Sequence, residues 1–182
     1  MAEEKYTDVF LTALLSDGDL IRTLTGQAVR EKEDALLDGY NLVVQRLDKI
    51  PESVQKIIRG SWGDNFESYN LAPGEGSIKG IKCKVTQDQW DRLKDWEFVE
   101  LGWFVPKEVE IRNPNSGETK RVLTLVMGEG QQYDRKDDGL NFVPFLMSRE
   151  KTLEVATKAR QLYDDRMGRS PEKQNSTLEG NN

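Results

Sequence analysis

Glu97 is the residue of this sequence best placed to do chemistry, because it ends a predicted amphipathic helix and precedes a strongly apolar run around Phe104. A carboxyl group in apolar surroundings has a raised pKa, and a pKa near neutrality suits proton transfer. The chain contains no histidine, so acid–base chemistry falls to a carboxylate, a lysine or a tyrosine. The alternative is that Glu97 only ends the helix on its solvated side, as structural carboxylates usually do.

The single cysteine, Cys83, excludes an internal disulfide. It lies in a run of alternating apolar and polar residues, Ile78–Val85, which places its side chain on the same face as Ile81 and Val85. We therefore expect a buried, inert thiol rather than a nucleophile. With one cysteine and no histidine, zinc, haem and iron–sulfur sites are not expected, and the sequence predicts no metal and no cofactor.

Length and charge limit the classes of protein that remain. The 182 residues carry 26 Lys and Arg against 32 Asp and Glu, a net charge of −6, which argues against nucleic acid as a partner. No run of 18 apolar residues predicts a membrane span, and the charged N-terminus does not resemble a signal peptide, so we expect a cytoplasmic protein. The sequence predicts a single domain over 1–167 and a disordered C-terminal tail over 168–182, because the tail contains almost no apolar residue.

The helix that would position Glu97 has a clear start. Thr86 and Gln89 have the spacing of a capping box, in which each side chain hydrogen-bonds the backbone of the other residue. Trp90 and Leu93 then follow at helical spacing as one buried stripe, and Glu97 lies on its edge.

The remaining pattern mixes strands and helices without regular alternation, which predicts an α+β protein. Expected elements are strands over 6–15 (running into a loop), 35–44, 78–85, 103–112 and 119–127, a helix over 51–58, a short helix or loop over 19–26, and a final helix from Ser148 to Met167. Turn residues predict a turn at 73–77, a hairpin turn at 113–117 and, over 128–140, a loop that is either mobile or a cover. Gly39 indicates a bulge or the close approach of another backbone. Pro106 indicates a place at a sheet edge or bulge, and the four tryptophans are expected in the core or in pocket walls.

Three segments over residues 6–165 resemble the γ-glutamylcyclotransferase-like (AIG2-like) superfamily. They are Gly80-Ile81-Lys82-Cys83-Lys84-Val85, Leu93-x-x-x-Glu97 and Phe104-Val105. The resemblance implies a small mixed β-barrel with flanking helices and a cyclotransferase whose catalytic carboxylate is Glu97. In the family's reaction, the α-amino group of a γ-glutamyl unit attacks its own γ-carbonyl and releases 5-oxoproline and an amine.

The chain departs from the family in the substrate loop. The family's Tyr-Gly-Ser/Thr-Leu, whose backbone amides hold the substrate, corresponds here to Leu11-Thr12-Ala13-Leu14. The resemblance assigns substrate binding to these four residues and to Phe104. Threonine in place of glycine is expected to resist the backbone conformation of that loop. The apolar loop suggests a bulkier, less polar ligand.

Three functions remain open. The first is cyclotransferase action on a γ-glutamyl compound or glutathione-derived conjugate, with natural-product metabolism as one setting. The second keeps Glu97 as a proton shuttle for cyclisation or isomerisation of a hydrophobic small molecule. The third is a non-catalytic binding protein that kept the barrel. The partner is a small molecule in each case, and the sequence leaves monomer and homodimer open.

Overall fold

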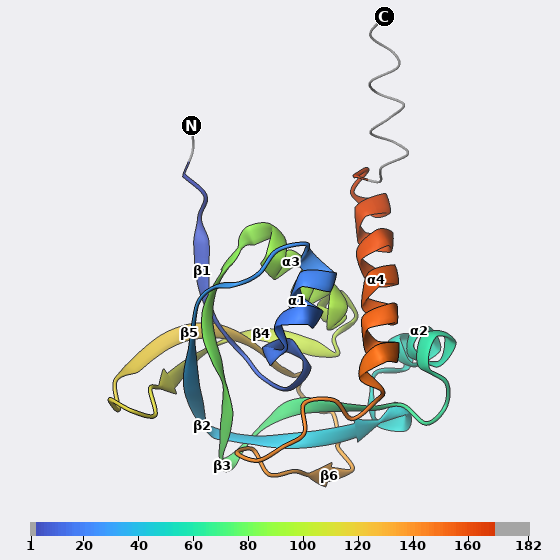
Figure 1. The fold of residues 1–182 in the computed structure, drawn as a ribbon. Helices are drawn as coiled ribbons and strands as arrows, with labels where there is room; N and C mark the ends of the chain where they lie inside the picture. The colour runs from blue at the N-terminus through green and yellow to red at the C-terminus, as the bar shows by residue number, and fades with distance from the viewer. Residues whose placement is uncertain (1–2, 170–182) are drawn as a thin grey trace, which may run out of the picture.

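A closed ring of five strands forms the centre of the structure (Figure 1), a computed structural model that describes residues 3–169. The strands are β1 (Tyr6–Leu11), β2 (Arg30–Arg46), β3 (Glu67–Thr86), β4 (Phe104–Arg112) and β5 (Thr119–Met127), with a short β6 (Arg135–Lys136) outside the ring. The helices are α1 (Gly18–Thr25), α2 (Glu52–Trp62), α3 (Gln87–Trp96) and α4 (Arg149–Arg166). Short 3₁₀ turns are η1 (Ala13–Ser16), η2 (Leu47–Lys49) and η3 (Val99–Leu101).

The strand order shows how the ring closes. Neighbours follow the order β3-β1-β5-β4-β2, and β2 pairs back with β3. The pairing of β1 with β5 is parallel and the other pairings are antiparallel, so the barrel is mixed. Figure 1 shows the four helices gathered on one side of it. The predicted α+β class and the small mixed barrel with flanking helices are confirmed.

The two longest strands bend together at a bulge. The register of β2 against β3 shifts between Asp38 and Tyr40, where Gly39 has a φ of +84°. Opposite this point, a Cβ on Gly74 or Gly76 would collide with the Asn41 side chain. The prediction of a turn at 73–77 that precedes a strand is therefore wrong. The glycines in that segment serve a bulge inside a continuous β3, whereas Gly39 was correctly interpreted.

Alternate residues of the strands belong to two separate clusters of buried hydrophobic side chains. Val9 and Leu11 of β1 join the cluster between barrel and helices, whereas Phe10 joins a cluster drawn almost entirely from strands, which fills the barrel. Cys83 lies in the first cluster, fully buried, and burial raises the pKa of its thiol to about 12. The prediction of a buried, inert cysteine is confirmed.

Local signals placed several other elements correctly. The Thr86 hydroxyl accepts from the Gln89 amide at 3.1 Å, and Gln89 Oε1 accepts from the Thr86 amide at 3.0 Å, as a capping box requires. The hairpin of β4 and β5 pairs from Phe104–Met127 to Arg112–Thr119. Pro106 lies beyond the short stretch over which β4 pairs with β2, so its missing N–H interrupts no ladder there.

Other boundaries differ from the predictions. The first strand ends at Leu11, and the chain then turns into η1. Residues 18–25 form a helix because the Asp17 carboxylate caps it, accepting from the amides of Asp19 and Leu20. Within the segment 128–140, expected to be a loop that is mobile or a cover, two residues form β6, which pairs with Val43 and Val44 of β2.

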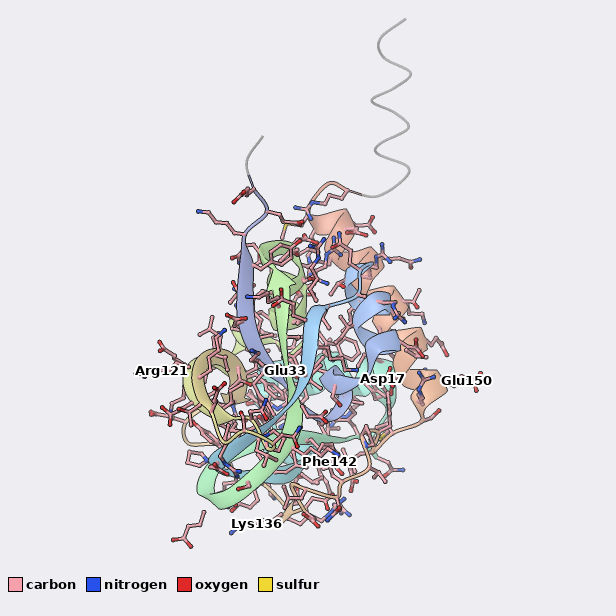
Figure 2. All side chains as sticks on the ribbon, turned by 60° about the vertical axis from the view of Figure 1, so that its left-hand side comes forward. Asp17, Glu33, Arg121, Lys136, Phe142 and Glu150 are labelled. Atoms are coloured by element: carbon pink, nitrogen blue, oxygen red, sulfur yellow. The ribbon has the colours of Figure 1, made fainter. Side chains whose placement is uncertain are left out.

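Charged residues make up 32% of the chain. Figure 2 shows charged side chains on several sides of the molecule, among them Arg121, Lys136 and, at the start of α4, Glu150. Most of the tail expected to be disordered, residues 170–182, lies outside the described residues. Within residues 3–169, no helix has both the length and the apolar composition needed to cross a membrane.

Candidate functional site

Glu97 occupies the C-terminal cap of α3, where its amide donates to the Leu93 carbonyl at 3.2 Å. The next residue, Phe98, has a φ of +51°, which turns the chain sharply out of the helix. The Glu97 side chain is buried, with 8% of its residue surface exposed. The alternative interpretation of Glu97 as a solvated helix end is therefore wrong.

The Glu97 carboxyl group is unusual because it is buried without a partner. Across residues 3–169 it accepts no hydrogen bond and forms no ion pair. Burial alone raises its pKa to about 8. At neutral pH the group is therefore mostly protonated, and it can change its protonation state within the physiological range.

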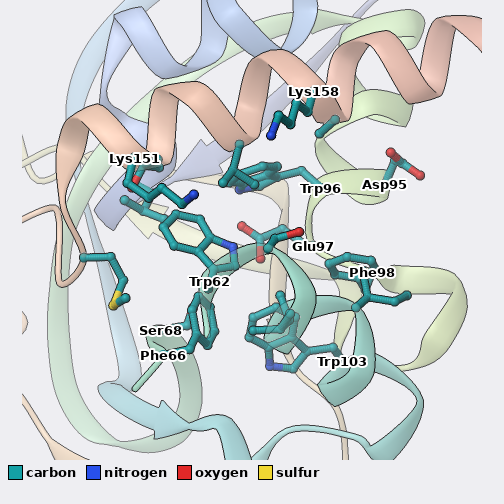
Figure 3. A pocket seen from close by; sticks show the side chains of 18 of the residues that line it. Trp62, Phe66, Ser68, Asp95, Trp96, Glu97, Phe98, Trp103, Lys151 and Lys158 are labelled. Atoms are coloured by element: carbon teal, nitrogen blue, oxygen red, sulfur yellow. The ribbon is translucent and has the colours of Figure 1, made fainter. Parts of the chain in front are cut away.

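Glu97 lines a large cavity of about 370 Å³, a size typical of small-molecule sites. Figure 3 shows its carboxyl group among aromatic side chains, beneath α4. The aromatic walls are Trp62, Phe66, Trp96, Phe98 and Trp103. Helix α4 contributes one face to the same cavity, with Lys151, Val155, Lys158 and Leu162 spaced at intervals of three or four residues.

A buried hydrogen-bond network fixes one aromatic wall. The Trp103 indole N–H donates to Gln45 Oε1 at 2.9 Å, and Asn70 donates to the same oxygen at 3.0 Å. The amide nitrogen of Gln45 donates to the Gln131 side chain and the Gln132 carbonyl. Gln45 is fully buried and all its hydrogen-bonding groups are used, so Trp103 is held in one orientation.

A second, smaller cavity of about 50 Å³ brings together every site residue predicted from the sequence. Its lining includes Glu97, Leu11, Thr12, Ala13, Leu14 and Phe104. Glu97 lines both cavities and therefore lies where they meet. At this size the smaller cavity has room for a compact polar group, and the bulk of any ligand must occupy the larger one.

The backbone of the 11–14 segment corrects one expectation. Thr12 has a φ of −141°, an extended conformation open to any residue, and its hydroxyl donates to the Lys79 carbonyl at 2.6 Å. The left-handed residue is Ala13, with a φ of +52°. Threonine thus does not distort this loop, because the unusual conformation falls on the next residue.

Two amides of this segment are available to a ligand. Ala13 and Leu14 open η1, and the first amides of a helix have no acceptor within it. Neither amide donates a hydrogen bond to another group of residues 3–169. Close packing behind the segment requires Gly80, since a Cβ there would lie 2.5 Å from the Leu11 carbonyl oxygen.

The sequence interpretation missed the walls supplied by distant segments. The tryptophans were predicted to be core or pocket walls, and Trp62, Trp96 and Trp103 line the large cavity. The contribution of α4 was not predicted, although the helical spacing of Lys151 and Lys158 around Val155 was visible in the sequence.

The fold has known relatives, although no protein-family model and no curated protein sequence matches the chain. A structure described as a γ-glutamyl cyclotransferase superposes with a TM-score of 0.55 at 13% identity, covering 89% of this chain and 86% of that one. An Arabidopsis thaliana protein solved in solution gives 0.52 at 18% identity, with 90% and 89% covered. An uncharacterized human protein gives 0.52 at 14% identity, with 90% and 86% covered. Because these matches span nearly the whole of each chain, this protein has the γ-glutamyl cyclotransferase-like fold.

Proposed function

We propose that this protein is a cyclotransferase that acts on a γ-glutamyl compound with a bulky, largely apolar leaving amine, and that Glu97 is its general acid–base. The observation that carries the proposal is the buried, unpartnered Glu97 carboxyl group at the junction of a small cavity with free backbone amides and a large aromatic one. Glutathione-derived conjugates belong to this substrate class, and natural-product metabolism is one setting that would supply them.

The pKa of Glu97 suits the proton transfer that ring closure needs. An α-amino group beside a peptide bond has a pKa of about 8, and the free carboxylate beside the α-ammonium of a γ-glutamyl unit raises its pKa somewhat, so it lies near or a little above the value of about 8 for Glu97. Proton transfer between groups of matched pKa is nearly isoenergetic, so neither direction of transfer imposes a large barrier. A bound ammonium would also favour the ionised carboxylate by direct attraction.

The reaction then takes two proton transfers through one carboxylate. Glu97 accepts a proton from the α-ammonium, and the freed amine attacks the γ-carbonyl carbon to form the ring C–N bond. The Ala13 and Leu14 amides supply donors for the developing oxyanion. As the original amide C–N bond breaks, Glu97 returns its proton to the leaving nitrogen, and the ring nitrogen releases its second proton to solvent, which gives 5-oxoproline and a free amine. Holding the γ-glutamyl chain folded adds the rate advantage of an intramolecular attack.

The test is release of 5-oxoproline, measured by mass spectrometry with a panel of γ-glutamyl amides. Glu97→Gln retains the shape of the protonated acid and removes the proton carrier, so kcat/KM should fall roughly 10²–10⁴-fold. Glu100→Gln is the matched control, because Glu100 is exposed, three residues away and not part of either cavity lining. Glu97→Gln with near wild-type turnover would refute the catalytic assignment.

The difference in size between the two cavities favours a second candidate function. The larger cavity is mostly apolar, and the smaller one has little room for a γ-glutamyl chain, which suits a Glu97-dependent cyclase or isomerase of a hydrophobic molecule. That enzyme would release no 5-oxoproline, yet its turnover would still depend on Glu97. A non-catalytic binding protein would instead show ligand-dependent melting with no turnover at all.

A further inference from the structure

Two lysines of α4 project over the large cavity and have weak partners. Figure 3 shows Lys151 and Lys158 extending from the helix above Trp62 and Trp96. Within residues 3–169, their only ion-pair partner is Glu154, at 3.9 and 3.8 Å, which exceeds hydrogen-bonding distance. Glu154 is exposed and is not part of the cavity lining. Both ammonium groups therefore keep donors available for a ligand.

The acidic residues of the same cavity do not offset these charges. Glu67 is bound by Arg46 and by Arg135, at 3.3 and 3.1 Å. Asp95 accepts from Arg166 at 2.6 Å. Glu97 is buried, has no partner among the described residues, and stays mostly protonated at neutral pH. The cavity thus combines aromatic walls and the Glu97 carboxyl group on one side with the positive charge of Lys151 and Lys158 on the α4 side.

We propose that Lys151 and Lys158 bind an anionic group on the leaving part of the substrate, while its aromatic or other large apolar portion packs against the tryptophan walls. This inference rests on the proposed function, because reaction at Glu97 places the leaving amine in the large cavity. The substrate class is then a γ-glutamyl conjugate of an aromatic amino acid, or of a peptide that retains its terminal carboxylate.

Three probes separate the two features of such a substrate. γ-Glutamyl-tryptophan carries both the ring and the carboxylate, γ-glutamyl-tryptamine carries the ring alone, and γ-glutamyl-glycine carries the carboxylate alone. We expect the lowest KM for the tryptophan conjugate. Lys151 and Lys158 are 43% and 70% exposed, so solvent screens each contact, and the carboxylate should lower KM only about three- to thirtyfold. Raising the salt concentration should shrink that advantage.

The double variant Lys151→Gln/Lys158→Gln tests the two residues directly. It should raise KM for γ-glutamyl-tryptophan to the value for γ-glutamyl-tryptamine, and leave kcat and the tryptamine KM unchanged. Lys136→Gln is the matched control, since Lys136 is an exposed lysine on β6, away from α4 (Figure 2). A carboxylate preference that is absent in the wild type, or that survives in the double variant, would overturn the inference.

A binding measurement separates this inference from the proposed function. Calorimetry of the Glu97→Gln protein with the tryptophan and tryptamine conjugates needs no turnover. If no probe yields 5-oxoproline, the proposed function fails, and a lysine-dependent preference for the tryptophan conjugate would still support the anion site. If 5-oxoproline forms but neither binding nor KM depends on the two lysines, the cyclotransferase stands and the anion site is refuted.

Discussion

Glu97 and Phe98 are consecutive residues with φ angles of opposite sign, −93° and +51°, and both side chains line the large cavity. Glycine is the usual residue where a chain leaves a helix with positive φ. A phenylalanine in that conformation lowers the stability of the fold by about 1–2 kcal/mol, and here it directly follows the buried Glu97 carboxyl group. Such strain is typical of functional sites, and here the turn directs an aromatic ring into the same cavity as Glu97.

The buried Glu97 should make the stability of the protein depend on pH. Its pKa is about 8 in the folded protein against 4.5 in the unfolded chain, so between these values the unfolded chain binds fewer protons. Stability contributed by the neutral carboxyl is fully present below pH 4.5 and declines as pH rises to about 8. Glu97→Gln, which cannot ionise, should therefore be more stable than wild type at pH 8–9, by roughly 2–5 kcal/mol, and equally stable near pH 4.

Urea unfolding of both proteins across this pH range measures the difference. Glu100→Gln again serves as the control and should follow the wild-type curve, because Glu100 is exposed. A Glu97→Gln curve parallel to wild type from pH 4 to pH 9 would mean that Glu97 titrates as a solvated carboxylate.

The pH–rate profile should place Glu97 in the reaction. Under the proposed mechanism the productive complex pairs an ionised Glu97 with a substrate ammonium. The acid limb of kcat/KM should then follow the pKa of Glu97, about 8, and the alkaline limb the substrate ammonium. Initial rates of 5-oxoproline release from pH 4 to pH 10 provide the measurement. An acid limb near 4.5 would contradict the assignment, because that value belongs to an exposed glutamate.

Elements encoded by neighbouring residues could be predicted from the sequence. The capping box of Thr86 and Gln89 set the start of α3, and helical spacing then placed Glu97 beside Leu93. Asn113 and Gly117 set the β4–β5 hairpin in the same way: the Asn113 side chain accepts from two turn amides, and Gly117 has positive φ. These signals act over three to five residues, so no tertiary contact is needed to interpret them.

Features that depend on distant contacts could not be predicted in this way. The glycines at 74 and 76 look like turn residues until Asn41 is known to lie against them. Ala13 has a positive φ although alanine, unlike glycine or asparagine, gives no sign of that conformation in the sequence. The walls of the large cavity come from α2, α3 and α4 and from the Trp103 segment, which only the closed barrel brings together.

Gln45→Leu should destabilise the protein strongly. The substitution replaces the amide with an apolar side chain of similar size, and it leaves the Trp103 indole N–H and the Asn70 amide without their shared acceptor. Each orphaned buried donor costs about 1–3 kcal/mol, so we expect a total loss of roughly 2–5 kcal/mol in urea unfolding. Gln55→Leu is the control, since within residues 3–169 the Gln55 side chain makes one hydrogen bond, to the Ile50 carbonyl, and is less buried. Equal losses for both variants would mean that the Gln45 network adds nothing to stability.

Thr12 offers a test of what the altered substrate loop does. Because its φ is −141° and its hydroxyl donates to the Lys79 carbonyl at 2.6 Å, glycine at this position relieves no strain and removes a hydrogen bond. Thr12→Gly should cost about 1–2 kcal/mol, from the lost bond and the greater freedom of the unfolded chain. It should bring no gain in kcat/KM on simple γ-glutamyl amino acids. Thr12→Ser keeps the hydroxyl and should stay within about 0.5 kcal/mol of wild type.

Thr12→Val completes the series, because valine keeps the β-branched shape and loses only the hydroxyl. It should lose about 0.5–1.5 kcal/mol, and comparison with Thr12→Gly separates the hydrogen bond from chain flexibility. Thermal and urea unfolding, with kcat/KM corrected for the folded fraction, provide the measurements. Thr12→Gly with wild-type stability and faster turnover of γ-glutamyl-glycine would reverse this view, since threonine itself would then be what excludes small substrates from the cavity beside Glu97.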